Sequence, residues 1–297
     1  MRRAVLIVNP FSTSVTDERV ARIEGVLRGR VEVVTRRTDG PGHAAELARE
    51  AAAEADAILV FSGDGTYNEA INGADGAVPF GFLPGGGTSV VPRALGLPRD
   101  PTAAAERLVA SLVAGRTRTI AVGRVNGRRF AFSAGIGLDA ELIRRVDRRG
   151  RASDGKRPGN MAFMATLAGL LAERRLRVPP QLEVEGHGRA AFLLVANGEP
   201  YTYAGPLPVV VNRAARFEGG LDFVAPRRLT PALAPGFLWR AFRGTVGESR
   251  SVLAGHDVDR LVARCDSPLP LQADGEDLGD VTEAIFEAER DALTVLA

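Results

Sequence analysis

Two glycine-rich segments of the chain carry residue types that bind phosphate. The first, Gly63-Asp64-Gly65-Thr66, directly follows an apolar run, residues 57–61, and opens a segment with helical spacing. Glycines let backbone N–H groups approach an anion closely, and a helix N-terminus adds unpaired N–H groups and partial positive charge. Asp64 is placed where a carboxylate can hold Mg²⁺ against phosphate oxygens, because Mg²⁺ prefers oxygen ligands and keeps water. A tight turn in which Asp64 or Thr66 caps a helix explains the same four residues equally well.

A second glycine loop makes a phosphate site the better explanation. Residues 85–88, Gly-Gly-Gly-Thr, follow the apolar run 79–83, and a third polar segment, residues 9–14, follows the apolar run 4–8. The carboxyl ends of parallel strands meet at one edge of a sheet, and ligands of open α/β sheets bind at that edge. Three such loops at one edge indicate a nucleotide site more strongly than any one of them alone.

An acidic segment, Asp274-Gly275-Glu276, lies near the end of the chain. Taken without the upstream loops, the same residues are more simply explained as a solvated acidic turn.

The composition excludes several classes of protein. Lys156 is the only lysine, so all but one of the 38 basic residues are arginine. A Walker-type loop and a protein kinase both need a lysine on the phosphates, and the surroundings of Lys156 match neither. The net charge of +2 gives no case for nucleic acid. The single cysteine, Cys265, fits a reducing compartment, and no apolar stretch approaches the ~20 residues that span a bilayer. We therefore expect a cytoplasmic protein whose only membrane contact is peripheral, at the inner face.

The elements that must position these residues follow from the hydrophobic pattern. The first half alternates short apolar runs bounded by turn residues with segments of helical spacing, which predicts a parallel α/β sheet. The expected strands are residues 4–8, 31–35, 57–61 and 79–83, and the expected helices include residues 17–28 and 43–54.

The second half has the pattern of a mainly β domain. Residues 119–133 predict a hairpin, because Asn126-Gly127 suits the positive φ angles of a type I′ turn. Further short strands are expected at residues 181–185, 191–196, 208–211, 221–224 and 261–263. Two helical insertions, residues 139–149 and 161–175, interrupt them.

The order of these motifs resembles that of the bacterial diacylglycerol kinase-like lipid kinases, which are related to sphingosine and ceramide kinases and distantly to NAD kinases. The resemblance rests on residues 62–69, 84–88, 132–139 and 274–276. It implies a three-layer α/β nucleotide-binding domain of the NAD kinase and phosphofructokinase type, residues 1–122 with 284–297. It also implies a β-sandwich lipid domain with helical insertions, residues 123–283.

The resemblance further implies an ATP- and Mg²⁺-dependent transfer of phosphate to a lipid alcohol such as diacylglycerol. Asp64 would organise the Mg²⁺, and Asp274 or Glu276 would accept the proton of the hydroxyl. The residues expected to contact ATP are Asn9, Pro10, Ser12, Thr38, Gly63, Asp64, Gly65, Thr66, Asn68, Glu69, Gly86, Gly87 and Thr88.

The chain departs from the family at three positions, which leaves alternatives open. Relatives have Asn where this chain has Ser89, Asp where it has Ala121, and an acidic residue where it has Gly219. A structural Mg²⁺ of the relatives would have to use Glu218 and Asp222 here. A nucleotide-binding relative with little or no activity, or a kinase of a soluble alcohol, are the alternatives.

An arginine cluster surrounds the apolar helix predicted at residues 161–172. It comprises Arg144, Arg145, Arg148, Arg149, Arg151, Lys156, Arg157, Arg174, Arg175 and Arg177. Such a surface could meet anionic headgroups while the helix covers or admits acyl chains, although a solvated arginine-rich face explains it as well. The lipid and the oligomeric state, with a homodimer as one alternative, are left open by the sequence.

Overall fold

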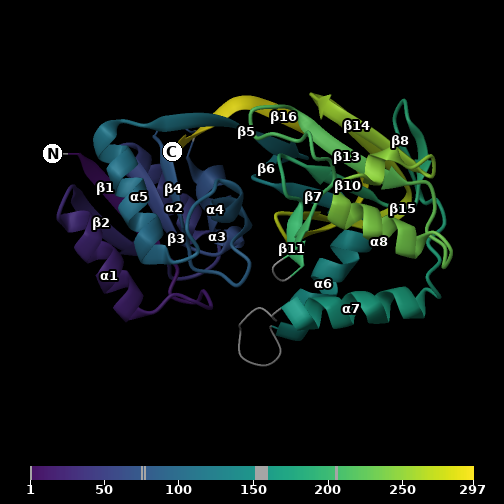
Figure 1. Cartoon of the computed structure of the whole chain (residues 1–297), viewed down its shortest axis with the longest axis horizontal. Helices are drawn as coiled ribbons and strands as arrows, with labels where there is room; N and C mark the ends of the chain where they lie inside the picture. The colour runs from purple at the N-terminus through teal and green to yellow at the C-terminus, as the bar shows by residue number, and fades with distance from the viewer. Residues whose placement is uncertain (1, 75, 77, 151–159, 205–206) are drawn as a thin grey trace. The chain divides into compact units, whose positions relative to one another are not determined.

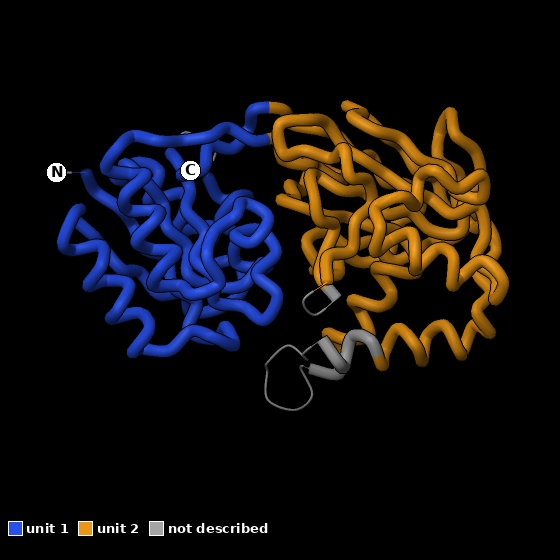
Figure 2. Tube along the Cα trace, in the orientation of Figure 1, with its two compact units in different colours: residues 1–120, 291–297 blue, residues 121–290 orange. Residues whose placement is uncertain are grey.

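The computed structural model describes residues 2–74, 76, 78–150, 160–204 and 207–297. The chain divides into two compact units (Figure 2): unit 1 is Met1–Ile120 with Asp291–Ala297, and unit 2 is Ala121–Arg290. Unit 1 alternates strands and helices, while unit 2 is mainly β with helical insertions (Figure 1). The predicted fold class, α/β followed by β, is confirmed.

Unit 1 is built on a parallel sheet. Its strands follow the order β2 (Glu32–Arg37), β1 (Arg3–Val8), β3 (Ala57–Ser62), β4 (Phe80–Pro84) and the end of β16 (Glu276–Leu296). The last pairing brings Val295 next to Phe80. Strands β3 and β4 are buried along their whole length because both faces of the sheet are covered. Strand β2 lies at the edge, which explains its polar, partly exposed residues.

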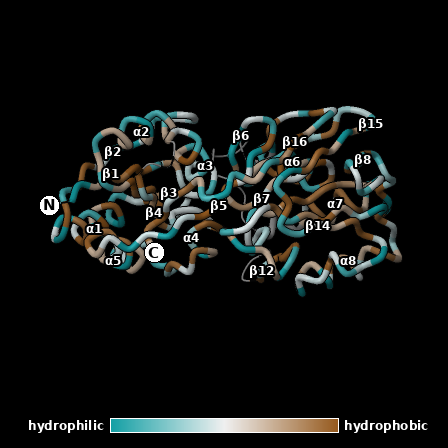
Figure 3. Tube along the Cα trace, turned by 90° about the horizontal axis from the view of Figure 1, so that it is seen from above, coloured by the Kyte–Doolittle hydropathy of each residue, from teal (hydrophilic) through white to brown (hydrophobic). Residues whose placement is uncertain are grey.

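Helices cover both faces of this sheet (Figure 3). Helices α1 (Asp17–Arg28) and α5 (Pro101–Ala114) pack together on one face, and α2 (His43–Ala52) and α3 (Asp64–Gly73) on the other. Helix α1 has the predicted bounds. Helix α5 was not predicted, although Asp100 caps its start, Pro101 follows and Gly115 ends it with φ +68. A short helix, α4 (Val90–Ala94), follows the second glycine loop.

Unit 2 contains a mainly antiparallel path of strands. In spatial order they are β14 (Val252–Val258), β13 (Leu221–Pro226), β10 (Leu193–Ala196), β7 (Ser133–Ile136), β15 (Arg260–Ala273) and β16. Strand β15 pairs with β8 (Leu182–Val184) in its first half and with β7 at its end. One long strand thus joins both parts of the β structure, with a core that includes Phe130, Phe223 and Phe286.

The predicted hairpin at the start of unit 2 is confirmed. Strands β5 (Thr117–Val125) and β6 (Arg128–Phe130) pair across Asn126 and Gly127, whose φ angles are +47 and +88. Two further short pairs are β8 with β9 (Gly188–Ala190) and β11 (Thr202–Ala204) with β12 (Leu207–Val209).

The two predicted helical insertions are also present, as α6 (Leu138–Gly150) and α7 (Asn160–Glu173). A third helix, α8 (Ala234–Arg243), was not predicted, because Pro235 and Gly236 near its start are typical of a turn. Within the residues that the structure describes, no helix is long and apolar enough to cross a membrane.

Candidate functional site

The two glycine loops of unit 1 touch through their backbones. A Cβ added to Gly86 would lie 2.7 Å from the Cα of Gly63, and one added to Gly63 would lie 3.3 Å from the Cα of Gly86. The N–H of Gly85 donates to the carbonyl of Ser62 at 2.7 Å. Side chains at Gly63 and Gly86 would separate the loops, so glycine is required for their contact. Around Gly87, in contrast, an added Cβ would meet nothing within 4 Å.

A chain of hydroxyl groups ties the loop after β1 to the loop after β3. Asn9 Nδ2 donates to Thr66 Oγ1 at 2.9 Å, and Ser62 Oγ donates to the same atom at 2.7 Å. Ser12 Oγ lies 2.8 Å from Ser62 Oγ, and the N–H of Ser14 donates to the carbonyl of Gly85 at 2.9 Å. The three loops therefore form one polar edge of the sheet, as predicted. Ser62 was not expected among the residues of this edge. Its position as a polar residue at the end of a buried strand could have indicated it.

Asp64 begins helix α3 next to this edge. Its Oδ1 accepts a hydrogen bond from the N–H of Val91 at 3.2 Å. The hydroxyl of Tyr67 lies 2.6 Å from the carbonyls of Ser62 and Leu83, at the ends of β3 and β4. Burial, and next the charge of Asp64, raise the pKa of Tyr67 well above its usual value. The phenol of Tyr67 therefore stays a hydrogen-bond donor.

The donor chemistry of this edge fits a magnesium–phosphate ligand. A partly exposed carboxylate, neighbouring hydroxyls and the open backbone at Gly87 are oxygen and N–H groups of the kinds that Mg²⁺ and phosphate use. Ser89 reduces the number of available donors. It adopts φ +47, and its Oγ lies 3.2 Å from the N–H of Gly86, within hydrogen-bond geometry.

The other expected nucleotide contacts fall into two groups. Partly or fully exposed residues at the edge are Asn9, Pro10, Ser12, Gly63, Asp64, Gly65, Glu69, Gly86, Gly87 and Thr88. Three are buried: Thr38 is 3% exposed, Thr66 is 7% exposed and Asn68 is 0% exposed. Asn68 accepts two hydrogen bonds from Asn72 Nδ2, through its carbonyl at 2.8 Å and its Oδ1 at 3.2 Å.

In unit 2, Asp274 lies in the tight turn between β15 and β16. Asp274 and Gly275 have φ angles of +48 and +78, which favour glycine or a short polar residue. The Asp274 side chain is 1% exposed, and its carboxylate accepts the N–H groups of Ala131, Phe132 and Ser133 at 2.6, 3.0 and 3.1 Å. The acidic turn is thus an anchored structural element and not a solvated one at Asp274.

Glu276 is the more accessible carboxylate of this turn. Its side chain is 32% exposed and pairs with Arg128 at 2.5 Å. The next residue, Asp277, accepts two hydrogen bonds from Arg144, at 2.7 and 2.9 Å, and these lower the pKa of Asp277.

A buried polar network is hydrogen-bonded to the turn at Asp274 and Gly275. Tyr201 Oη and Gln272 Nε2 each donate to Asp139 Oδ2 at 2.6 Å, and Gln272 Oε1 accepts the N–H of Gly275 at 2.9 Å. Burial raises the pKa of Asp139. Asp139 was expected as part of the motif at residues 132–139, whereas Tyr201 and Gln272, which the fold brings from distant positions, were not expected.

The expected structural metal site has little donor capacity. Asp222 is 1% exposed, and its Oδ1 lies 2.6 Å from both Asn212 Nδ2 and His256 Nδ1. Burial raises the pKa of Asp222. Glu218 is exposed, and the described part of the chain contains no group of three or more His, Cys, Asp or Glu side chains placed to hold a metal ion. This donor set does not fit a structural metal.

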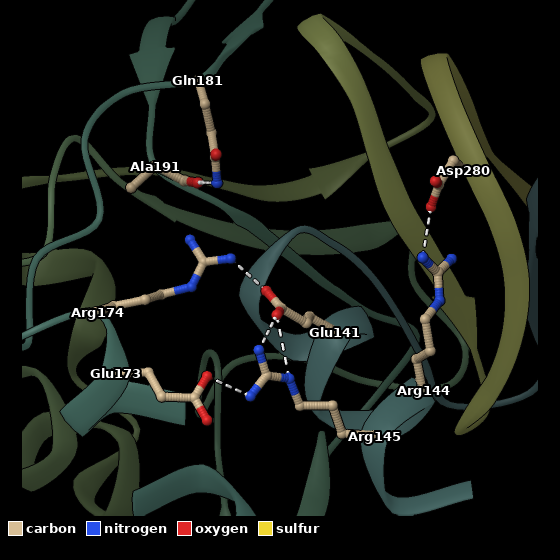
Figure 4. Close-up of polar contacts among 8 residues, drawn as sticks. All are labelled: Glu141, Arg144, Arg145, Glu173, Arg174, Gln181, Ala191 and Asp280. Atoms are coloured by element: carbon tan, nitrogen blue, oxygen red, sulfur yellow. Dashed lines mark hydrogen bonds and ion pairs between the residues drawn. The ribbon is translucent and has the colours of Figure 1, made fainter. Parts of the chain in front are cut away.

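Three of the arginines around α6 and α7 pair with carboxylates (Figure 4). Arg145 pairs with Glu141 and Glu173, both at 2.6 Å, and Arg174 also pairs with Glu141. Arg144 pairs with Asp280 at 2.6 Å as well as with Asp277. The charges of these three arginines are neutralised by neighbouring carboxylates, so the positive charge expected for a membrane-binding surface is reduced here. Arg151, Lys156 and Arg157 lie outside the described residues.

Comparisons with known proteins agree with this architecture. Residues 3–125 match the diacylglycerol kinase catalytic domain. The diacylglycerol kinase of Bacillus subtilis strain 168 is 34% identical over 195 residues, which cover 64% of this chain but only 61% of that protein. A crystal structure of a diacylglycerol kinase from Bacillus anthracis strain Sterne shares the fold with a TM-score of 0.72 at 19% identity, covering 99% of this chain and 96% of that one. A second crystal structure from the same organism gives a TM-score of 0.78 at 20% identity and covers 99% of this chain and 95% of that one.

Proposed function

We propose that the chain is an ATP-dependent kinase of the diacylglycerol kinase family and that it phosphorylates a hydroxyl group of a lipid such as diacylglycerol. The observation that carries the proposal is the meeting of three polar loops at one edge of the unit 1 sheet. Two of these loops touch through glycine backbones, which keeps side chains away from the place where phosphate would lie.

In this proposal unit 1 holds the phosphate donor without a lysine. Asp64 would hold Mg²⁺, which neutralises charge on the phosphates when bound. The backbone at Gly87 and the side chains of Asn9, Ser12 and Thr88 would supply N–H and hydroxyl donors. Phosphoryl transfer needs mainly positioning and electrostatic stabilisation, and these groups can provide both.

The turn of unit 2 would serve the acceptor. We assign acceptance of the hydroxyl proton to the pair Asp274 and Glu276. Glu276 is exposed enough to reach a hydroxyl, whereas Asp274 is held by three backbone N–H groups and fixes the turn. We further propose that the protein works in the cytoplasm, at the inner face of the membrane that holds its substrate.

One observation favours a second candidate, a nucleotide-binding protein with little activity. Ser89 Oγ takes up the N–H of Gly86, which removes one donor from the phosphate loop. Ala121 supports the same candidate. Its N–H donates to the carbonyl of Phe217 and its carbonyl accepts from Asn197 Nδ2, and its methyl side chain cannot supply the charge of an aspartate.

The test is a transfer assay with the full chain, labelled ATP, Mg²⁺ and a panel of diacylglycerol, ceramide, sphingosine and polyprenol in mixed micelles. We expect labelled phosphate in at least one of these lipids. ATP binding by calorimetry without any labelled lipid would favour the inactive candidate. Absence of ATP binding as well would contradict both.

A further inference from the structure

Helix α8 of unit 2 carries apolar side chains beyond the face that it buries. Ala234, Phe237 and Ala241 point to the core of the unit, where Phe237 packs edge-on against Phe192. Beside this buried face Leu238, Trp239 and Phe242 form a stripe with side chains that are 42%, 61% and 40% exposed. The apolar part of the helix is therefore wider than the part that covers the core, and the exposed stripe needs another explanation.

Exposed apolar side chains elsewhere in the described residues are scattered. Six large apolar residues are exposed there, and three of them belong to this single helix of ten residues. Isolated exposed apolar residues are ordinary, whereas a contiguous group on a soluble unit marks a surface that contacts something.

The charge around this stripe identifies the contacting surface. Residues 226–251 contain five arginines and a single acidic residue, Glu248. Arg240 lies 3.8 Å from Glu248, at the limit of an ion pair. The guanidinium of Arg243 lies 4.6 Å from the centre of the Trp239 ring. Arg144, Arg145 and Arg174 of the cluster around α6 and α7 are paired with carboxylates, whereas residues 226–251 have more arginines than acidic residues.

We propose that α8 docks on the surface of an anionic phospholipid bilayer. Leu238, Trp239 and Phe242 enter the boundary between headgroups and acyl chains, while Arg240 and Arg243 contact lipid phosphates. An aromatic side chain with a polar tip suits that boundary, and each arginine near an anionic surface adds to the attraction. The docking uses residues other than the proposed nucleotide and acceptor residues and stands whether or not the chain is a kinase.

A pocket beside α8 has the same dual character. Its volume is about 210 Å³, and it is lined by Arg228 and Arg240 together with Leu233 and Phe237. A headgroup phosphate and the first carbons of a lipid chain combine the two kinds of contact that such a lining offers.

The chain contains one tryptophan, so its fluorescence reports on α8 alone. The probe is vesicles of phosphatidylcholine alone or of equal parts phosphatidylcholine and phosphatidylglycerol, mixed with the full chain without ATP. We expect a blue shift of Trp239 emission and co-sedimentation with the anionic vesicles only. Phosphatidylglycerol brominated on its acyl chains should quench Trp239.

Two variants make the test specific. Phe242→Ser should weaken binding on the order of tenfold, and Arg243→Gln about fivefold, since one arginine near an anionic surface contributes ~1 kcal/mol. Val113→Ser, which changes a 52% exposed apolar residue of α5, is the matched control and should bind as the wild type does. All variants should keep the wild-type melting temperature, because the changed side chains are exposed.

Co-sedimentation without a Trp239 shift would place the membrane contact elsewhere and overturn the proposal. Equal binding to both vesicle types, or no binding to either, would overturn it too. If Phe242→Ser instead converted a dimer to a monomer in sedimentation velocity, with no Trp239 shift on adding vesicles, the stripe would belong to an interface between two copies of the chain.

Discussion

The loops of unit 1 and the acidic turn of unit 2 use backbone N–H groups in opposite ways. In unit 1 the missing side chains of Gly63 and Gly86 bring two backbones together, and the space at Gly87 stays open. In unit 2 the carboxylate of Asp274 already binds three backbone N–H groups. The loops of unit 1 therefore leave room for an anionic ligand. In unit 2 the Asp274 carboxylate is itself the anion that occupies the backbone N–H groups, so they cannot bind a ligand.

This difference predicts that mutations in the two regions reduce different properties of the protein, ligand binding in unit 1 and stability in unit 2. Added volume should damage unit 1 through ligand binding, because the loops must stay in contact. Removed charge should damage unit 2 through stability, because buried N–H groups would lose their acceptor.

The largest effect is expected for Asp274→Ala. The variant leaves the N–H groups of Ala131, Phe132 and Ser133 buried without their acceptor, and we expect a loss of about 3–5 kcal/mol in the free energy of unfolding. Urea denaturation followed by circular dichroism measures it. Asp277→Ala is the control, since loss of its partly exposed pair with Arg144 should remove no more than about 1 kcal/mol. Equal stability of the two variants would show that Asp274 is not an anchor.

The next effect is expected for Gly86→Ala. The new Cβ would stand 2.7 Å from the Cα of Gly63, so the two loops must separate. We expect a loss of about 1–3 kcal/mol in stability and ATP binding weakened on the order of tenfold or more, since a displacement of about 1 Å disrupts such sites. Calorimetric titration with ATP and Mg²⁺ gives the affinity.

Gly87→Ala serves as the control for that substitution. An added Cβ there meets nothing within 4 Å, so stability should be unchanged. If Gly86→Ala were as stable as Gly87→Ala, close contact between the two loops would not be required by the fold.

A smaller effect concerns the pH dependence of stability. Burial raises the pKa of Asp139 above the ordinary value of 3.8, so the folded state binds this proton more tightly than the unfolded state. The resulting stabilisation is fully present below the ordinary pKa and is lost as the pH rises through the raised one.

Asp139→Asn should therefore flatten the pH dependence in that range. The amide oxygen can still accept from Tyr201 and Gln272, but the residue has no proton to lose. We expect the stability of the wild type to fall relative to that of the variant as the pH rises from acid to neutral. Buried Asp222 is present in both proteins, so the difference between the two curves isolates Asp139. Parallel curves would contradict the raised pKa.

The sequence predicted those parts of the fold and site that depend on local signals. Helix α1, the hairpin at Asn126-Gly127 and the two glycine loops each have their determinants within a few adjacent residues. Strand β16 was missed because charged residues recur along its 21 positions and obscure the alternation of a strand. Its stability comes from pairing with β15, which is not visible locally.

The polar partners could not be predicted for a related reason. Tyr201 and Gln272 meet Asp139 from positions 62 and 133 residues away. Asn68 was expected at the nucleotide but is buried, because the spacing of the motif does not say which face of α3 meets the core. Arg144 was predicted to face a membrane, because its carboxylate partner Asp277 lies 133 residues away in the sequence and cannot be recognised locally.

The central claim is that Asp64 at the glycine loops serves phosphate transfer to a lipid. It is tested most directly by the initial rate of labelled phosphate transfer from ATP to diacylglycerol by the wild type and by Asp64→Asn. The asparagine keeps an oxygen for the N–H of Val91 but loses the charge for Mg²⁺. We predict transfer by the wild type and a rate on the order of a hundredfold lower in the variant at unchanged melting temperature. Equal rates in the two proteins would contradict the account.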